Sequence, residues 1–203
     1  MIAVLSYGVS NVGSILNMLH RANIPAVAVS TAAEIKRADR IILPGVGAFD
    51  HGMAALRDLG LAEPLKMRVV QDRVPILGIC LGMQLFGKGS EEGVLEGLGL
   101  VDGYCERFRF EGNPALKVPH MGWNVFTSRR ESRLFDNLDE RARFYFVHSY
   151  HLVCSDRDDV LATSRYGIEF TAMVQRGNVW GAQFHPEKSH RYGMALLSNF
   201  ARL

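Results

Sequence analysis

The chain has 203 residues, of which 48% are hydrophobic, 9% aromatic and 22% charged. This length and composition predict one globular domain over residues 1–203 and exclude a disordered protein, a collagen-like repeat and a coiled coil. Lys and Arg number 23 against 21 Asp and Glu, a formal net charge of +2. So small an excess predicts neither nucleic-acid nor membrane binding.

The N-terminal residues, the short apolar runs and the few cysteines predict a soluble cytoplasmic protein. Met1 to Ser6 lacks the basic stretch and the length of a secretory signal. No apolar run approaches the ~20 residues that span a bilayer. The three cysteines, Cys80, Cys105 and Cys154, are odd in number and too sparse for a disulfide framework.

The first half of the sequence alternates short apolar runs with amphipathic segments. Continuous aliphatic runs predict buried strands at 2–5, 26–29, 41–43 and 75–79, with a turn at 44–47 after the third. Apolar residues at helical spacing predict helices over 12–22, 49–59 and around 65–69. Strands separated by single helices are typical of βαβ units. We therefore expect an α/β fold with an open, mostly parallel sheet flanked by helices on both faces.

The second half has a different character. Runs at 144–147, 168–174 and 179–184 are strand-like and separated by short turns such as 176–178. They predict antiparallel strands that extend the sheet in the C-terminal half. Tyr192, Leu196 and Phe200 mark one face of a closing helix.

The segment Gly78-Ile79-Cys80-Leu81-Gly82 places a thiol between two glycines, after a predicted strand. A nucleophile on a sharp strand-to-helix turn has strained backbone angles, and its neighbours two positions away must lack side chains. A helix starting near Leu81 or Gly82 would favour the thiolate and offer amides to an oxyanion. Cys80 is therefore the candidate nucleophile, although free cysteines are often simply small buried hydrophobes.

A histidine and a carboxylate lie close together in Gln183-Phe184-His185-Pro186-Glu187. Pro186 favours extended backbone at His185, and in an extended segment residues i and i+2 share a face. Glu187 could then fix the imidazole tautomer while His185 carries the proton that a thiolate mechanism needs. By itself the segment would be interpreted as a polar turn. The presence of Cys80 earlier in the chain favours a catalytic interpretation instead.

The other histidines and cysteines predict no metal site and no cofactor. His148 and His151 are three residues apart, but no helix is predicted there, which argues against a zinc site. Cys105 and Cys154 lack the setting of Cys80, so we expect them to be structural.

Three motifs together resemble the class I, or triad, glutamine amidotransferases: residues 44–47, 78–84 and 183–189. The resemblance extends over nearly the whole chain. It implies hydrolysis of L-glutamine to glutamate and ammonia through a thioester on Cys80, with His185 as base and Glu187 as its orienting group. It also implies an oxyanion hole from the Val46–Gly47 amide and that of Leu81, and glutamine-binding residues at Gln84, Glu92, Ser149 and Tyr150.

Within that family, residues 90–92, 119–124 and 146–150 are similar to the glutaminase subunits of imidazole glycerol phosphate synthases. This likeness implies a heterodimer with a (β/α)₈-barrel synthase or cyclase subunit of the HisF type, which receives the ammonia for histidine biosynthesis. The candidate docking residues are Met121, Trp123, Asn124 and Lys188. Core packing is the alternative for Trp123.

Other functions stay open. Ser6 to Asn11 departs from the family's usual Asp-Tyr-Gly followed by a Gly-Asn pair. Residues 49–53 and 189–194 look like paralogues that supply ammonia for a surface-polysaccharide sugar. Another cysteine hydrolase, a stress protein that detoxifies carbonyls, or a non-catalytic regulatory module could use the same fold. The combination of Cys80, His185 and Glu187 favours the glutaminase.

Overall fold

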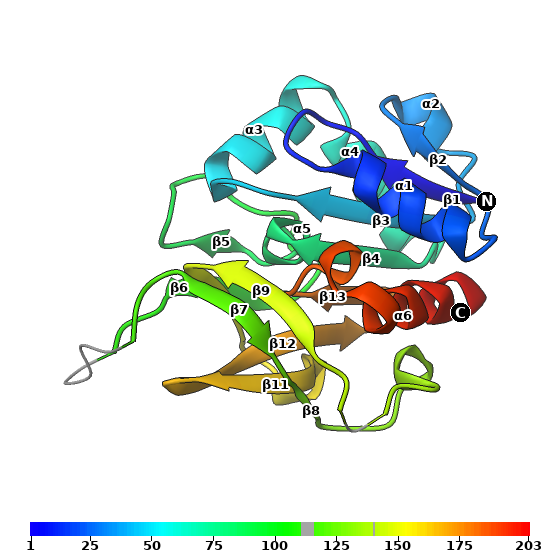
Figure 1. Cartoon of the computed structure of the whole chain (residues 1–203). Coiled ribbons are helices and arrows are strands. Elements are labelled where there is room, and N and C mark those ends of the chain that lie inside the picture. The colour runs from blue at the N-terminus through cyan, green and yellow to red at the C-terminus, as the bar shows by residue number, and fades with distance from the viewer. Residues whose placement is uncertain (111–115, 140) are drawn as a thin grey trace.

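The structure is a computed structural model that describes residues 1–110, 116–139 and 141–203. Within these residues an eight-stranded sheet crosses the molecule in the order β2-β1-β3-β4-β13-β12-β11-β8 (Figure 1). Its strands are β1 (Ile2–Leu5), β2 (Ala26–Val29), β3 (Arg40–Gly45), β4 (Ile76–Cys80), β8 (Thr127–Ser128), β11 (Val160–Tyr166), β12 (Ile168–Arg176) and β13 (Val179–Ala182). β1 to β4 and β13 are parallel, and β12, β11 and β8 continue the sheet antiparallel. The predicted fold class is confirmed.

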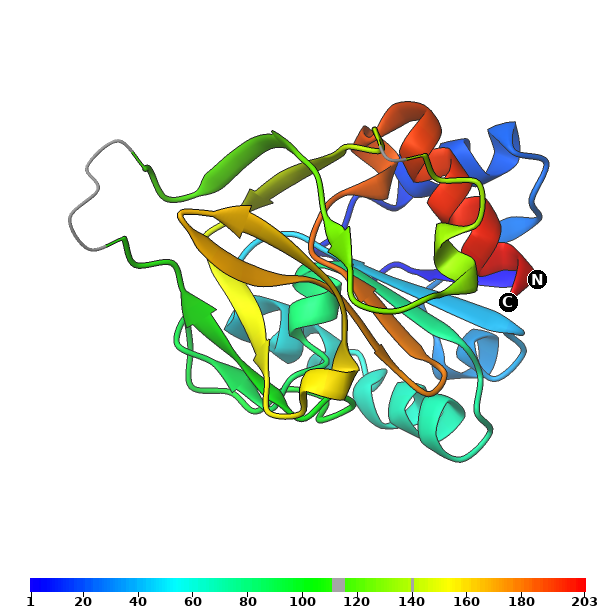
Figure 2. The ribbon, with the colours of Figure 1, turned by 90° about the horizontal axis from the view of Figure 1, so that it is seen from below.

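Helices cover both faces of the sheet (Figure 2). They are α1 (Val12–Arg21), α2 (Ala32–Ile35), α3 (Phe49–Asp58), α4 (Ala62–Val70), α5 (Leu81–Gln84) and α6 (His190–Arg202), with 3₁₀ turns at Arg133–Phe135, Arg157–Asp159 and Pro186–Lys188. Successive strand residues point to opposite faces. Val4 and Ile42 join the core that includes α1 and α6, whereas Leu5 and Leu43 join the core that includes α3 and α4. Burial on both faces explains why these strands are continuous apolar runs in the sequence.

Two smaller sheets complete the fold. One has the order β10-β6-β5, and the other pairs β7 with β9. Their strands are β5 (Gly89–Ser90), β6 (Gly103–Arg107), β7 (His120–Asn124), β9 (Phe144–His148) and β10 (Tyr150–Cys154). The strand predicted at 144–147 exists, but its expected place in the main sheet was wrong. In that sheet β12 already has β13 and β11 as neighbours, and β8 covers β11, so β9 pairs with β7 instead.

The predicted turn at 44–47 was also partly wrong. Pro44 and Gly45 pair in parallel with Ile79 and Cys80, so β3 runs two residues further and the chain leaves the sheet at Val46. This extension brings the loop after β3 level with the end of β4.

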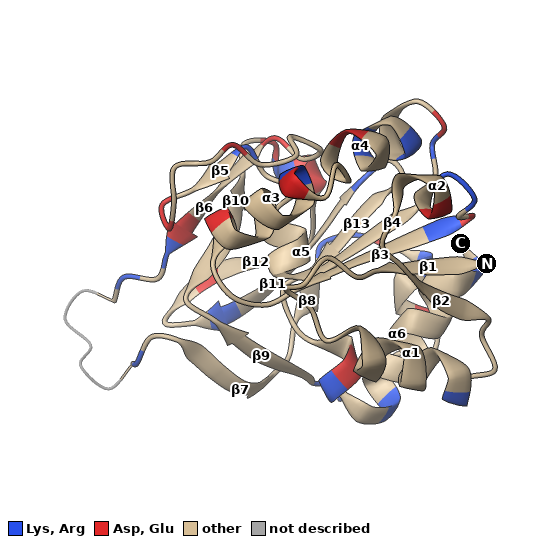
Figure 3. Cartoon of the chain, turned by 90° about the horizontal axis from the view of Figure 1, so that it is seen from above, with Lys and Arg blue, Asp and Glu red and all other residues tan. Residues whose placement is uncertain are grey.

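Charged residues of both signs lie mainly on helices, loops and strand ends, with the central strands largely free of them (Figure 3). None of the helices in the described part of the chain has the length and apolarity needed to cross a bilayer.

Candidate active site

Cys80 lies at the turn between β4 and α5 with φ 54° and ψ −112°. This left-handed backbone is strained for a residue with a side chain. A Cβ on Gly82 would lie 1.8 Å from the Leu43 carbonyl oxygen, and one on Gly78 would lie 2.7 Å from the Gly82 carbonyl oxygen. Both glycines are therefore required by crowding, as the sequence pattern predicted.

His185 and Glu187 form a buried pair. Nδ1 of His185 lies 2.7 Å from Oε1 of Glu187, and the two side chains are only 2% and 4% exposed. The backbone is extended at His185, but a 3₁₀ turn begins at Pro186, so the expected extended geometry through Glu187 was wrong. Proline suits the first position of a helical turn because it needs no donor there. The predicted contact forms through this turn.

The His185 ring is held by its surroundings. Its backbone N–H donates to the Tyr145 carbonyl at 2.9 Å, and its carbonyl accepts from the buried Ser189 hydroxyl at 2.6 Å. Its Nε2 atom is buried and has no hydrogen-bond partner among the described residues. Burial alone lowers the pKa of His185, but the nearby Cys80 and the hydrogen-bonded Glu187 outweigh it and raise that pKa to about 10. The imidazole is therefore held protonated beside the sulfur.

Two further groups contact the sulfur of Cys80. The thiol donates to the Val147 carbonyl at 3.9 Å, and Nε2 of Gln183 donates to the sulfur at 3.8 Å. The sequence motifs did not predict a role for Gln183. The available signal was its position two residues before His185, because alternate residues of an extended segment share a face.

One cavity of about 460 Å³ brings the predicted site together. It is lined by the candidate nucleophile and base and by every predicted oxyanion-hole and glutamine-binding residue: Cys80, His185, Val46, Gly47, Leu81, Gln84, Glu92, Ser149 and Tyr150. These residues come from β4, α5, the loops after β3 and β5, the segment that joins β9 to β10, and the turn after β13. The cavity thus lies at the carboxyl ends of the parallel strands, where open α/β sheets bind ligands.

The backbone N–H groups around the cavity differ in whether they already donate a hydrogen bond. Leu81 begins α5, so its N–H has no intrahelical acceptor. The Val46 N–H donates to the Val9 carbonyl at 2.8 Å, and Gly47 follows with φ +96°. In this conformation the N–H of the Val46–Gly47 peptide, rather than that of Val46, stays available.

The polar side chains of the cavity are fixed by hydrogen bonds. Nε2 of Gln84 donates to the Tyr150 carbonyl at 2.9 Å and to Oε1 of Gln183 at 3.0 Å. Oε2 of Glu92 accepts from the Phe49 N–H, at the start of α3, at 2.9 Å. Gln84 therefore offers an acceptor, and Glu92 a carboxylate, to a ligand with N–H groups.

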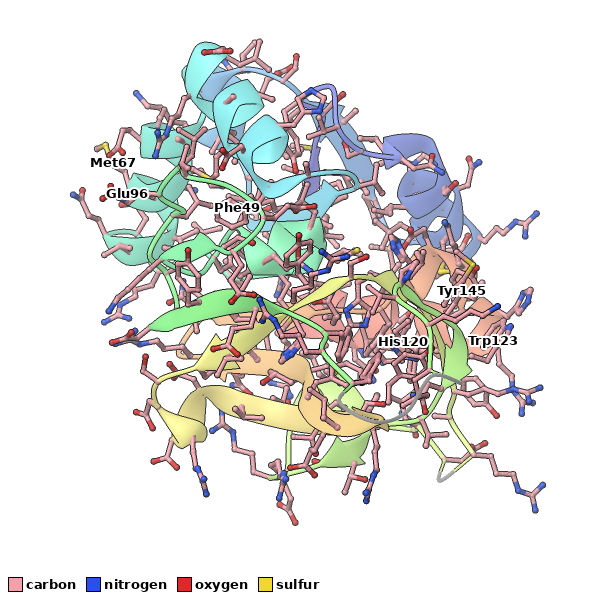
Figure 4. The ribbon with its side chains drawn as sticks, turned by 90° about the vertical axis from the view of Figure 1, so that its left-hand side faces the viewer. Phe49, Met67, Glu96, His120, Trp123 and Tyr145 are labelled. Carbon is pink, nitrogen blue, oxygen red and sulfur yellow. The ribbon has the colours of Figure 1, made fainter. Side chains whose placement is uncertain are left out.

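The candidate docking residues separate into two groups. Met121 and Trp123 are 61% and 44% exposed on the outer face of β7, so core packing of Trp123 is excluded. Trp123 lies beside Tyr145 (Figure 4), with ring centroids 6.1 Å apart, and the Lys188 ammonium sits 5.7 Å above the Tyr145 ring. The Asn124 side chain points the other way and donates to the Arg165 carbonyl at 3.0 Å.

Two histidines form a buried pair at the cavity, and one of them, His148, is part of its lining. His120 Nδ1 lies 3.1 Å from His148 Nε2, and His148 Nδ1 lies 2.8 Å from the Tyr150 carbonyl oxygen. Burial lowers the pKa of His120 to about 4 and that of His148 to about 3, so both are neutral at pH 7. Across residues 1–110, 116–139 and 141–203, no cluster of three or more His, Cys, Asp or Glu is arranged to hold a metal ion.

Known proteins match this chain over its full length. Chains named imidazole glycerol phosphate synthase subunit HisH 2 are 49% identical in Pseudomonas aeruginosa, with all of both chains covered, and 47% identical in Methanococcus maripaludis, with 100% of this chain and 99% of that one covered. The solved structure of PurLQS from Thermotoga maritima has a TM-score of 0.74 at 20% identity and covers 99% of this chain and 97% of that chain, a likeness of fold. The family model described as glutamine amidotransferase class-I matches residues 3–203. The chain belongs to the class I glutamine amidotransferase family.

Proposed function

We propose that this chain hydrolyses L-glutamine to glutamate and ammonia with a Cys80–His185–Glu187 triad, as the glutaminase subunit of an imidazole glycerol phosphate synthase in histidine biosynthesis. The observation that carries the proposal is the 2.7 Å contact between His185 and Glu187 at a cavity shared with the strained Cys80. Relatives named HisH that align over the whole chain support it. We further propose that residues 1–203 act as one amidotransferase domain.

The chemistry follows from these positions. The Cys80 thiolate attacks the side-chain amide carbon of glutamine, and the N–H groups of Leu81 and of the Val46–Gly47 peptide stabilise the oxyanion, each by about 3–4 kcal/mol. His185 passes a proton from Nε2 to the departing ammonia, which leaves a glutamyl thioester. The neutral His185 then takes a proton from water, which attacks the thioester, releases glutamate and restores the Cys80 thiolate beside the protonated imidazole. Glu187 keeps the ring oriented through Nδ1.

The glutamine-binding residues are assigned by the same cavity. Oε1 of Gln84 is its remaining polar atom, because both amide protons have acceptors. We assign it and the Glu92 carboxylate to N–H groups of the substrate, and the Ser149–Tyr150 backbone to the opposite wall. No cofactor takes part in this reaction.

The ammonia product needs an acceptor site, which we assign to a partner subunit. Ammonia that reaches bulk water is protonated and loses its nucleophilicity, so it must pass directly to an acceptor site from which water is excluded. We propose that the chain forms a cytoplasmic heterodimer with a HisF-type (β/α)₈-barrel subunit and binds neither nucleic acid nor a membrane. Met121, Trp123 and Lys188 would dock it, because Trp123 and the cavity-lining Lys188 lie against Tyr145 and Met121 is exposed on the same strand as Trp123. Asn124 would act from behind β7 by fixing the strand.

The decisive experiment measures glutamate release by the chain with and without a HisF-type barrel subunit and its acceptor. Glutamate release that rises with the partner and disappears in Cys80→Ala is the expected result. Full activity of the lone chain would contradict control by docking. Trp123→Ala should weaken partner binding, whereas Met67→Ala, which removes a similarly exposed apolar side chain on α4, should not.

A second acceptor stays under consideration because residues 49–53 and 189–194 resemble the paralogues that amidinate a surface-polysaccharide sugar, while residues 6–11 depart from the family's usual pattern. The glutaminase chemistry is the same in both cases. Identifying the polypeptide that co-purifies with the chain, and then supplying each acceptor in turn, separates the two pathways.

A further inference from the structure

Gln183 is a fully buried amide that joins the Cys80 sulfur to the substrate side of the cavity. Its side chain is 0% exposed. Its Nε2 lies 3.8 Å from Sγ of Cys80, and its Oε1 lies 3.0 Å from Nε2 of Gln84. The residue thus touches both the nucleophile and a residue assigned to glutamine binding.

The surrounding groups determine which end of the Gln183 amide faces the sulfur. The Tyr150 carbonyl can only accept, so the group of Gln84 that faces it at 2.9 Å must be the donating Nε2. The second proton of that nitrogen points to Gln183, which must therefore present its oxygen there. The nitrogen of Gln183 is left facing Cys80. The hydrogen-bond partners therefore determine which end of each side-chain amide is the oxygen and which is the nitrogen.

The Tyr150 carbonyl is itself held in place by the histidine pair. His148 Nδ1 donates to it at 2.8 Å, so Nε2 of the neutral ring is an acceptor, and His120 Nδ1 donates to that atom at 3.1 Å. Asn124 Nδ2 lies 3.3 Å from the remaining ring nitrogen of His120, which accepts. A directed series of hydrogen bonds therefore runs from β7 to the carbonyl that orients Gln84.

We propose that Gln183 is a positioning residue for the nucleophile: its N–H holds and stabilises the Cys80 thiolate, and its carbonyl links that contact to Gln84. Hydrogen bonds to a charged acceptor in a site of low dielectric are about twice as strong as neutral ones. The Val147 carbonyl, 3.9 Å away, accepts the proton of the neutral thiol but cannot stabilise a thiolate. Gln183 thus favours the reactive form. The link to glutamine turnover rests on the proposed function, whereas the effect on the thiol does not.

Two variants separate the contacts of Gln183. Gln183→Glu keeps an acceptor for Gln84 but puts a carboxylate oxygen in place of the N–H that faces the sulfur. Gln183→Met removes both contacts without adding a charge. Gln175→Met makes the same chemical change on β12 and serves as the control.

The first measurement is the rate of Cys80 alkylation by iodoacetamide from pH 5 to 10, with the modified peptide identified by mass spectrometry. Losing a hydrogen bond to a charged group corresponds to a change of about tenfold or more in an equilibrium constant. The pH midpoint of alkylation should therefore rise by about one unit in Gln183→Met and further in Gln183→Glu, with no change in Gln175→Met. Lost packing alone would not produce this order. A midpoint in folded Gln183→Met equal to that of the unchanged chain would overturn the proposal, even if the Glu variant fails to fold.

The second measurement is glutaminase activity in the complex with the barrel subunit. Gln183→Glu should lower kcat at least tenfold with KM nearly unchanged, whereas Gln183→Met should also raise KM because Gln84 loses its partner. A rise in KM alone in both variants would contradict the role at the sulfur. If Cys80→Ala were fully active, the proposed function would fail, whereas the alkylation result would still decide the role of Gln183.

Discussion

Nδ1 of His185 and Oε1 of Glu187 lie 2.7 Å apart in a site where both side chains are almost completely buried. Glu187→Gln keeps the shape but replaces the charged acceptor. The ring then loses the group that fixes its tautomer, so kcat should fall by about 10²–10⁴-fold. Glutamate release in the complex measures this. The residual rate should exceed that of Cys80→Ala, since the nucleophile stays, and equal residual rates would contradict this division of roles.

The same pair predicts a dependence of stability on alkaline pH. The pKa of His185 is raised to about 10, so the folded chain holds a proton that the unfolded chain releases near the ordinary histidine pKa of about 6.5. The stabilisation is complete below pH 6.5 and is lost as the pH rises to about 10. The free energy of unfolding in urea should therefore fall over this window. Glu187→Gln, which removes one cause of the raised pKa, should show a smaller fall, and parallel curves would contradict the assignment.

Cys80→Ala should leave a folded chain without glutaminase activity. The substitution removes the nucleophile, and alanine retains the Cβ that the turn already accommodates. Circular dichroism checks the fold and glutamate release checks the activity. Cys154→Ala is the matched control, because burial raises the pKa of that thiol to about 12 and it lies outside the cavity lining. Loss of activity in the control would contradict the assignment of Cys80.

Gly82→Ala should prevent folding or cost several kcal/mol of stability. The added Cβ would lie 1.8 Å from the Leu43 carbonyl oxygen, a backbone atom that cannot move without separating β3 from β4. Gly13→Ala, in α1, meets nothing within 4 Å and should stabilise the chain by about 0.5–1 kcal/mol. Thermal unfolding of the two variants measures both effects. A Gly82→Ala variant as stable as the unchanged chain would contradict the crowded turn.

The buried histidines predict a loss of stability in acid. Because the pKa of His148 is lowered to about 3, the unfolded chain binds a proton below pH 6.5 that the folded chain does not. The free energy of unfolding should fall from pH 6.5 towards pH 4, by up to about 1.4 kcal/mol per pH unit for each such histidine. His148→Asn should flatten this slope in urea titrations at pH 8 and 5.5. His51→Asn, which removes an exposed histidine, should leave it unchanged.

The sequence predicts best the features that depend on local chemistry. β1, β3 and β4 are recognisable because burial on both faces makes them continuously apolar. The turn at Cys80 is recognisable because its crowding is resolved by glycines two residues away. The short α2 was missed although it carries a local signal, the capping box between Thr31 and Glu34.

Features that depend on distant segments could not be predicted in the same way. The partner of β9 is β7, and nothing in the apolar pattern of 144–147 distinguishes that ribbon from an addition to the main sheet. The partners of Gln183, at positions 80 and 84, are about a hundred residues away in the sequence. The hydrogen bond from the Val46 N–H to the Val9 carbonyl is likewise a backbone contact, which side-chain patterns do not encode.

The parallel pairing of β4 with β13 has a consequence for how such a protein can diversify. Ile79 is paired with Ala182, so nucleophile and base are aligned by two adjacent strands and not by the long stretch of chain between them. Lineages can therefore change the surface of that stretch, and so exchange one companion subunit for another, as long as the cavity residues within it keep their places. Natural variation in length and surface chemistry should accumulate in the parts of that stretch outside the cavity lining, while the two strands stay invariant in register.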